Sequence, residues 1–228
     1  MQDQHTVVFI GATGAVGSAA LNRLLSKKDV SKILTLGRRA VELEEPPAHL
    51  NQALIDIHDP STYADHIKNY QTAICTLGVG EPSKVSKADF VAIDKTAVLN
   101  FAEVCKAKGV KQFHLLSSIG VSSSSRNYYL RTKGELNDEL VKLQFERLSI
   151  FQPSMILTPQ NRYGLTQGLM LKLWPKLDFI LHKGLRKYRG IKVEMLGRAI
   201  ANNVFIEKEG VEYLQYDDFL RLQELVTS

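Results

Sequence analysis

The sequence of 228 residues contains little cysteine, and this absence sets the first limits on its chemistry. Its two cysteines, Cys75 and Cys105, are too few for a disulfide framework or for a zinc site of four thiolates. Two small buried side chains in a reducing compartment are the simplest interpretation. We therefore predict no metal site.

Long hydrophobic runs and targeting segments are also lacking. The most apolar stretch, residues 165–181, is interrupted by Lys172, Lys176 and Asp178. It therefore does not form the run of about eighteen apolar residues that a membrane-spanning helix needs. The apolar run at residues 7–10 is too short for the core of a secretory signal peptide. These absences predict a soluble cytoplasmic protein that does not bind a membrane.

Charge of one sign is only in mild excess, because 29 Lys and Arg face 24 Asp and Glu, for a net charge of +5. Nucleic-acid-binding proteins concentrate more basic charge than this, and no nucleic-acid partner is predicted. The excess is local: residues 172–198 carry eight Lys or Arg and two acids. This basic segment is interpreted first as a solvated surface. It could also be a lid that attracts an anionic substrate, or a docking surface for a protein partner.

What the sequence does contain is a regular alternation of short apolar runs with longer helical patterns. Strands are expected at residues 6–10, 32–36, 53–57, 72–77, 112–116, 148–156 and 211–215. Helices are expected from the glycine turn to residue 25, and over 86–108, 128–144, 165–181, 194–206 and 217–226. This alternation is typical of an α/β fold with a doubly wound, mainly parallel sheet of about seven strands. Residues 1–228 are expected to form one domain, with a cofactor-binding core (1–156) and a small C-terminal substrate cap that ends in the last strand and helix (157–228).

A glycine-rich turn follows the first predicted strand and precedes the first predicted helix. It reads Gly11-Ala12-Thr13-Gly14-Ala15-Val16-Gly17. Small residues let a pyrophosphate approach the backbone closely, and the free N–H groups of a helix N-terminus bind its charge. The position between strand and helix therefore predicts a dinucleotide cofactor.

The end of the second predicted strand indicates which dinucleotide is bound. NAD sites commonly place a carboxylate here for the ribose hydroxyls. This chain instead has Arg38 and Arg39 after Gly37. A guanidinium can pair with the 2′-phosphate of NADP, so we predict that NADP(H) is preferred over NAD(H). Asp56, after the third predicted strand, could meet the adenine amino group.

Tyr129 and Lys133 are spaced by four residues, so on a helix they share one face. A tyrosine with its ordinary pKa of about 10 exchanges protons poorly at neutral pH, and a nearby ammonium favours the phenolate. A serine that ends the preceding strand could polarise a substrate carbonyl. Ser118 fits the spacing better than Ser117, which stays possible. A second Tyr-x-x-x-Lys, at Tyr188 and Lys192, lacks these neighbours and is interpreted as accidental.

Several further stretches, taken in order, resemble one protein family. They are Leu34-Thr35-Leu36-Gly37-Arg38-Arg39, Cys75-Thr76-Leu77-Gly78, Leu115-Leu116-Ser117-Ser118, residues 129–135, residues 145–153 and residues 198–204. With the glycine turn, they resemble the Tat-interacting-protein-like subgroup of the atypical short-chain dehydrogenase/reductases, which are NAD(P)-binding and epimerase-like. The likeness covers about residues 6–206.

The resemblance implies a Rossmann-type fold, NADP(H) binding and a possible homodimer. It implies that the cofactor contacts Gly11, Thr13, Gly14, Ala15, Val16, Gly17, Arg38, Arg39, Asp56, Leu77, Gly78 and Lys133. It also implies catalysis by Ser118, Tyr129 and Lys133 in an oxidoreductase that acts on a small-molecule carbonyl or alcohol. Gln152-Pro153-Ser154 departs from the Arg-Pro-Gly of related proteins.

Two other functions stay open. The chain could be an NADP(H)-binding sensor or scaffold without turnover, or an enzyme of the sugar-nucleotide epimerase type. The length of the chain argues against the second, because such enzymes usually carry a larger C-terminal substrate domain.

Overall fold

A computed structural model describes residues 4–158 and 183–225 of the chain. At its centre lies a sheet of seven parallel strands in the order β3-β2-β1-β4-β5-β6-β9. The strands are β1 (His5–Ile10), β2 (Val30–Gly37), β3 (Leu50–Leu54), β4 (Thr72–Cys75), β5 (Gln112–Leu116), β6 (Arg147–Phe151) and β9 (Gly210–Leu214). The order reverses between β1 and β4, which is where ligands bind in doubly wound folds. The predicted Rossmann-type fold is confirmed.

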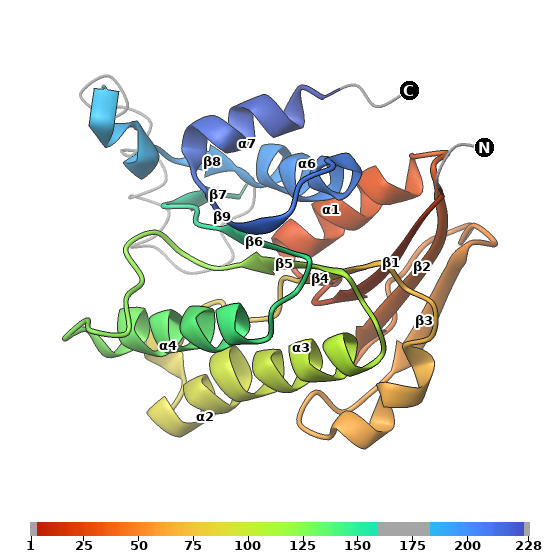
Figure 1. Cartoon of the computed structure of the whole chain (residues 1–228), viewed down its shortest axis with the longest axis horizontal. Helices are drawn as coiled ribbons and strands as arrows, with labels where there is room; N and C mark the ends of the chain where they lie inside the picture. The colour runs from red at the N-terminus through yellow and green to blue at the C-terminus, as the bar shows by residue number, and fades with distance from the viewer. Residues whose placement is uncertain (1–3, 159–182, 226–228) are drawn as a thin grey trace.

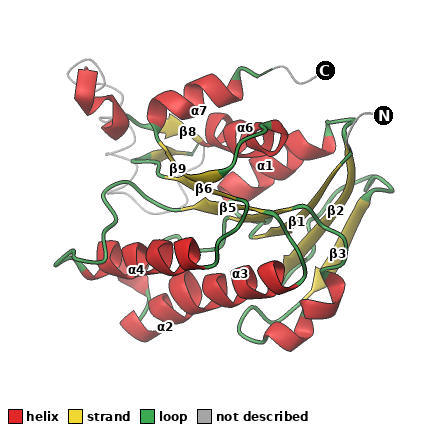
Figure 2. Cartoon of the chain, in the orientation of Figure 1, coloured by secondary structure: helices red, strands yellow, loops and turns green. Residues whose placement is uncertain are grey.

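Helices cover both faces of this sheet (Figure 1). On one face lie α1 (Ala15–Leu25), α6 (Val193–Asn202) and α7 (Tyr216–Gln223). On the other lie α2 (Lys87–Val91), α3 (Val98–Ala107) and α4 (Tyr128–Lys142), with a π-helical turn at Ala92–Ala97 between α2 and α3. Figure 2 shows the resulting three layers, with the strands between two layers of helix.

The alternation of side chains along each buried strand builds two separate cores. In β1, Val8 and Ile10 pack under α3 and α4, whereas Val7 and Phe9 pack under α1 and α6. Each of these four side chains is at most 1% exposed. Both faces are apolar because both are covered, which explains the near-continuous apolar runs of the sequence.

Several element boundaries differ from the predicted ones. The third strand is Leu50–Leu54 and not 53–57, because its pairing with β2 begins opposite Ile33. The fourth strand ends at Cys75 and the sixth at Phe151, just before Pro153, which lacks an N–H for the ladder. Ile156–Leu157 (β7) instead pairs with Ile191–Lys192 (β8) in a second small sheet. The predicted helix at 165–181 lies outside the described residues.

The C-terminal third contributes to the central layers. β9 completes the sheet beside β6, and α6 packs closely on α1, where a Cβ at Gly197 would lie 2.6 Å from the Cβ of Ala19. One third of the stretch expected as a substrate cap (157–228), residues 159–182, lies outside the described residues.

A buried polar network joins β6 to β9 and to the end of α6. Arg147 is 1% exposed, and its Nε and Nη2 lie 3.0 and 2.6 Å from Oε1 of Glu212. Its guanidinium also donates to the side chain of Asn203 at 2.7 Å. Burial alone would raise the pKa of Glu212, but hydrogen bonds from Lys208, Ser149 and Arg147 outweigh it and lower the pKa to about 2. Glu212 is therefore charged in the folded protein at neutral pH.

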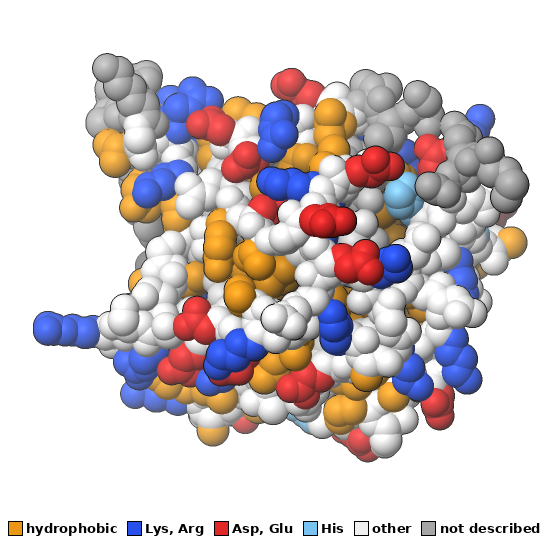
Figure 3. Space-filling model, in the orientation of Figure 1, with side chains coloured by type: hydrophobic (Ala, Val, Ile, Leu, Met, Phe, Trp, Pro, Cys, Tyr) orange, Lys and Arg blue, Asp and Glu red, His pale blue; other side chains and the backbone are white. Residues whose placement is uncertain are grey.

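The surface around β9 is partly apolar. β9 is an edge strand, and its side chains Val211 and Tyr213 are 46% and 50% exposed. Figure 3 shows apolar side chains gathered on this side of the molecule, between α7 and α4. Among the residues that the structure describes, no helix is both long enough and apolar enough to span a membrane.

Candidate functional site

The glycine turn between β1 and α1 forms a tight cradle. Gly11 has φ +90, and a Cβ there would lie 2.7 Å from the backbone N of Leu77. A Cβ on Gly17 would collide with the carbonyl oxygen of Gly11 and approach Oγ1 of Thr76 to 2.8 Å. Thr76 also donates a hydrogen bond of 3.0 Å to that carbonyl. The turn therefore requires glycine at both ends, and Thr76 fixes it against the end of β4.

The N-terminus of α1 is open to an anion. Gly14 is its N-cap, no side chain caps the helix, and its first turn contains no acidic residue. Thr13 and Gly14 are exposed. A helix start with unsatisfied N–H groups and no acid nearby suits a phosphate group. These residues therefore fit the pyrophosphate of a dinucleotide.

A cavity of about 70 Å³ continues from this cradle toward the end of β2. Five residues predicted to contact the cofactor line it: Gly11, Thr13, Arg38, Arg39 and Leu77. Both arginines are exposed, and neither has an ion-pair partner among the described residues. The structure thus brings the glycine turn and the arginine pair to one site.

Asp56, the predicted contact for the adenine amino group, does not line this cavity, and neither do Gly14, Ala15, Val16, Gly17, Gly78 and Lys133. Its Oδ1 accepts a hydrogen bond of 2.9 Å from the backbone N of His58, and its side chain is exposed. Ile57, the next residue, lines the cavity instead. Because β3 ends at Leu54, Asp56 lies in the turn beyond the strand and not at its end.

The Tyr–Lys pair lies in the first two turns of α4. Asn127 caps this helix by accepting a hydrogen bond of 3.1 Å from the backbone N of Leu130. The helix therefore begins at Tyr128, and Tyr129 and Lys133 share one side of it. Nζ of Lys133 lies 5.8 Å from the centre of the Tyr129 ring, and that ring packs on Phe90 of α2 at 5.5 Å.

The serine loop before α4 is held against the same helix. The backbone N of Ser122 donates to the carbonyl of Leu130 at 3.2 Å, and Nη1 of Arg131 donates to the carbonyl of Ser125 at 3.2 Å. A Cβ on Gly134 would collide with the backbone of Ser122 and Ser123. The run of serines at residues 122–125 is thus an ordered turn packed on α4.

The two serines after β5 differ in their contacts. Ser117 is buried, and its hydroxyl donates to Oδ1 of Asn137 in α4 at 3.3 Å. Ser118 is partly exposed, and its hydroxyl has no hydrogen-bond partner among the described residues. The hydroxyl of Ser117 is therefore engaged by Asn137, whereas that of Ser118 is not engaged by the described residues.

A buried carboxylate that the sequence analysis missed completes this cluster. Asp94 lies in the π-helical turn before α3 and is 1% exposed. Its Oδ1 lies 2.9 Å from Nζ of Lys133. Burial alone would lower the pKa of Lys133, but the charges of Asp94 and Tyr129 and the hydrogen bond to Asp94 raise it above its ordinary value. Lys133 is therefore an ammonium at neutral pH.

A signal for Asp94 was present in the sequence. The apolar residues that mark the helix over 86–108 include Phe90 and Ala97, and Asp94 lies four residues after the first and three before the second. It therefore falls on the buried side of that helix. A lone carboxylate on an apolar helix face needs a partner, and that partner is Lys133.

The second Tyr-x-x-x-Lys does not form a comparable pair. Tyr188 ends a short 3-10 helix (Lys183–Tyr188), whereas Lys192 lies in β8. The two residues are therefore not on one helix, in agreement with an accidental match.

Comparisons with known proteins identify the family of the chain. Residues 11–146 match the family model described as NAD(P)H-binding. The chain belongs to this NAD(P)H-binding family. The rat protein HTATIP2 is 32% identical over 222 residues, which cover 96% of this chain and 90% of the rat protein. Protein FMP52, mitochondrial, from Meyerozyma guilliermondii is 35% identical over 73% of this chain and 72% of its own length. The resemblance found in the sequence is confirmed.

Solved structures show the same fold. MoeE5 in complex with UDP-glucose and NAD superposes with a TM-score of 0.70 at 16% identity, covering 92% of this chain and 76% of that one. The ADP-L-glycero-D-manno-heptose-6-epimerase of Helicobacter pylori gives a TM-score of 0.65 at 14% identity, covering 97% of this chain and 81% of that one.

The region matched to the NAD(P)H-binding family holds every residue of the site described above. It begins at Gly11, the first residue of the cradle, and ends at Glu146, directly before the buried Arg147. Among the described residues, no group of three or more His, Cys, Asp or Glu could hold a metal ion. The cavity beside the glycine turn is lined from the ends of β1, β2 and β4.

Gln152, which departs from the pattern of related proteins, is buried in this family member. Its Oε1 accepts a hydrogen bond of 3.3 Å from Nε2 of Gln215, the N-cap of α7. The residue therefore joins the end of β6 to α7.

Gly17→Ala is expected to weaken binding of NAD(P)H by at least about tenfold, equivalent to 1.4 kcal/mol. The added methyl group would collide with the carbonyl of Gly11 and push the turn into the space of the pyrophosphate. Fluorescence titration with the reduced cofactor measures the affinity, and circular dichroism verifies folding. Gly184→Ala is the control, because a Cβ there meets no atom of the described residues within 4 Å. An unchanged affinity in a folded Gly17→Ala variant would show that the cradle does not hold the cofactor.

Proposed function

We propose that this chain is an NADP(H)-dependent oxidoreductase that interconverts a carbonyl and an alcohol. The observation that supports this most is the pairing of Tyr129 with the buried, charged Lys133 on one side of α4. The hydroxyl of Ser118 follows the neighbouring strand β5. These three side chains are what proton transfer to a carbonyl oxygen requires.

Each side chain has one task in the proposed reaction. Ser118 orients the carbonyl through its unengaged hydroxyl. Tyr129 gives its hydroxyl proton to the carbonyl oxygen during reduction, or takes the alcohol proton during oxidation. Lys133 holds the nicotinamide ribose, and its positive charge favours proton release by the phenol. The bound nicotinamide supplies or accepts the hydride.

The preference for NADP(H) is supported by Arg38 and Arg39 at the cavity and by the lack of a carboxylate at the end of β2. A charge-assisted hydrogen bond to a phosphate contributes about 1.5–3 kcal/mol. Arg38→Ala and Arg39→Ala are therefore each expected to weaken NADPH binding by about tenfold or more. NADH, which lacks the 2′-phosphate, should bind the variants about as well as the parent protein.

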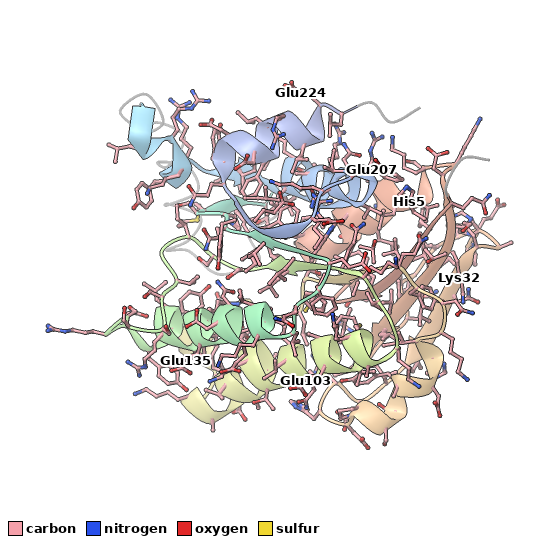
Figure 4. The ribbon with its side chains drawn as sticks, viewed as in Figure 1. His5, Lys32, Glu103, Glu135, Glu207 and Glu224 are labelled. Atoms are coloured by element: carbon pink, nitrogen blue, oxygen red, sulfur yellow. The ribbon has the colours of Figure 1, made fainter. Side chains whose placement is uncertain are left out.

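Parallel titrations with NADPH and NADH measure this preference. Lys32→Ala is a matched control, since this lysine lies earlier on β2 (labelled in Figure 4). Its Nζ contacts the ring of Tyr70 and the carbonyl of Lys68. Equal affinities of the unmodified protein for NADPH and NADH would contradict the proposed role of the arginine pair.

A panel of substrates separates the proposed enzyme from a sensor. NADPH oxidation is followed at 340 nm with aldehydes, ketones and α-dicarbonyls, and NADP⁺ reduction with alcohols. UDP-glucose is included because MoeE5 was solved with it. Turnover of a carbonyl supports the oxidoreductase. Tight NADPH binding without turnover of any compound would favour the sensor or scaffold.

Location and assembly remain predictions. The cytoplasmic location was inferred from the sequence, and the FMP52 relatives are named as mitochondrial proteins. A homodimer or a protein partner for the basic segment is likewise a proposal, which size-exclusion chromatography with light scattering tests.

A further inference from the structure

Asp94 has contacts that the proposed reaction does not use. Its Oδ1 pairs with Lys133 at 2.9 Å, and its Oδ2 accepts a hydrogen bond of 2.7 Å from the backbone N of Val79. Val79 lies in the loop after β4, two residues beyond Leu77, which lines the cofactor cavity. One buried carboxylate thus connects the catalytic helix to a cofactor-binding loop.

The chain makes room for this carboxylate. A Cβ on Gly78 would lie 3.1 Å from Oδ1 of Asp94, closer than side chains normally approach. Asp94 lies in a π-helical turn at Ala92–Ala97, between two α-helical segments. Such turns are frequent at functional sites. The predicted cofactor residue Gly78 therefore makes space for Asp94.

We propose that Asp94 is a positioning residue that keeps Lys133 charged and holds it in place for the cofactor. The inference rests on the proposed function, in which Lys133 holds the nicotinamide ribose. The ammonium carries three N–H donors. One is given to Asp94, and the others stay available for the ribose and for the side of α4 that carries Tyr129.

Among the groups around Lys133, Asp94 is the one whose negative charge stabilises the ammonium at neutral pH. Lys133 is 8% exposed, and the titratable groups that act on it are Asp94 from the π-helical turn, Tyr129 from α4 and Cys75 from β4. Burial raises the pKa of the Cys75 thiol to about 12, so Cys75 carries no charge at neutral pH. Without Asp94, burial opposes the ammonium with no full negative charge to offset it.

A second ion pair also joins the π-helical turn to α4, and it provides a control for the first. Nζ of Lys95 lies 2.6 Å from Oε2 of Glu135, with both side chains partly exposed. Figure 4 labels Glu135 on α4. Arg131 also approaches Glu135, at 4.0 Å. Exposed ion pairs of this kind contribute little to stability. Removing the Lys95–Glu135 pair therefore tests whether the loss of any contact between α4 and the π-helical turn changes the Lys133 pKa as the loss of Asp94 does.

Asp94→Asn is the test, because it keeps the shape of the side chain and an oxygen for the Val79 amide. Nitrogen-15 NMR of the lysine ammonium groups measures the Lys133 pKa, and Lys133→Arg assigns its signal. In the unmodified protein, Lys133 should titrate above 10.5. In Asp94→Asn, its pKa should fall below that of the unmodified protein, because burial then acts on the ammonium without the Asp94 charge. Glu135→Gln should leave it unchanged.

NADPH titrations at several pH values test the functional half of the proposal. Between pH 7 and pH 10, the affinity of Asp94→Asn should fall about five- to tenfold more than that of Glu135→Gln, since a charged donor binds more strongly than a neutral one. Asp94→Glu, which keeps the negative charge, should restore part of the NADPH affinity that Asp94→Asn loses. A purely structural role of Asp94 would not predict this rescue.

Distinct outcomes overturn the different parts. If Lys133 titrates at or below 10.5 in the unmodified protein, or equally in both variants, Asp94 does not hold its charge. The measurement on the unmodified protein stands even where Asp94→Asn fails to fold. If the Lys133 pKa falls but NADPH affinity keeps the same pH dependence, Asp94 does not act on cofactor binding. If the unmodified protein binds no NADPH, the proposed function fails while the NMR result stands.

Discussion

Arg147→Ala is expected to lower the free energy of unfolding by about 3–5 kcal/mol. The variant leaves the Glu212 carboxylate buried without its guanidinium and removes the donors to Asn203. Domains of this kind have a total stability of about 5–15 kcal/mol, so the loss is a large part of the whole. Urea denaturation followed by circular dichroism measures it.

Arg221→Ala is the matched control for this prediction. Nη2 of Arg221 lies 3.2 Å from Oδ1 of Asp218, and Arg221 is exposed whereas Asp218 is partly exposed. Removing such a pair should cost about 0.2–1 kcal/mol. Equal losses in the two variants would mean that the buried network contributes no more than a surface ion pair.

Tyr129→Phe is expected to lower turnover of a substrate from the carbonyl panel by about 10²- to 10⁴-fold, the usual contribution of a positioned acid or base. The substitution removes only the hydroxyl, so the contact of the ring with Phe90 at 5.5 Å is kept. NADPH affinity should therefore stay within about twofold of the parent, because no part of the cofactor cradle changes.

The chain offers its own control for this substitution. Tyr188→Phe removes a hydroxyl from the other Tyr-x-x-x-Lys and should leave turnover unchanged, since Tyr188 and Lys192 lie on separate elements. Steady-state kinetics at saturating NADPH compare the variants. Unchanged turnover in Tyr129→Phe would exclude it as the proton donor.

Sequence patterns were sufficient where one local rule decides the structure. The glycine turn, the strand β5 at Gln112–Leu116 and the start of α4 at Tyr128 all fall where the sequence placed them. In each case a short-range signal decides the structure. The turn needs glycines because a Cβ would collide there, β5 is an apolar run, and α4 begins after the capping Asn127.

Features set by long-range pairing could not be predicted in the same way. The position of β3 depends on its register with β2, and Asp56 consequently lies beyond the strand. The partners of Asp94 and Arg147 are 39 and 65 positions away in the sequence. Sequence alone gives the residue type and the helix face. Only the folded sheet brings Lys133 to Asp94 and Glu212 to Arg147.

The place of Glu212 in the sequence has a consequence for synthesis of the chain. The last predicted cofactor residue is Lys133, but the carboxylate that pairs with Arg147 follows that arginine by 65 positions. At about 5–20 residues per second, a ribosome needs roughly 3–13 s to supply it. During this interval the nascent chain carries an unpaired guanidinium beside a sheet that still lacks its last strand. A chain that stops before Gly210 would stay in this state, with all of its predicted cofactor residues but with β6 in place of β9 at the edge of the sheet.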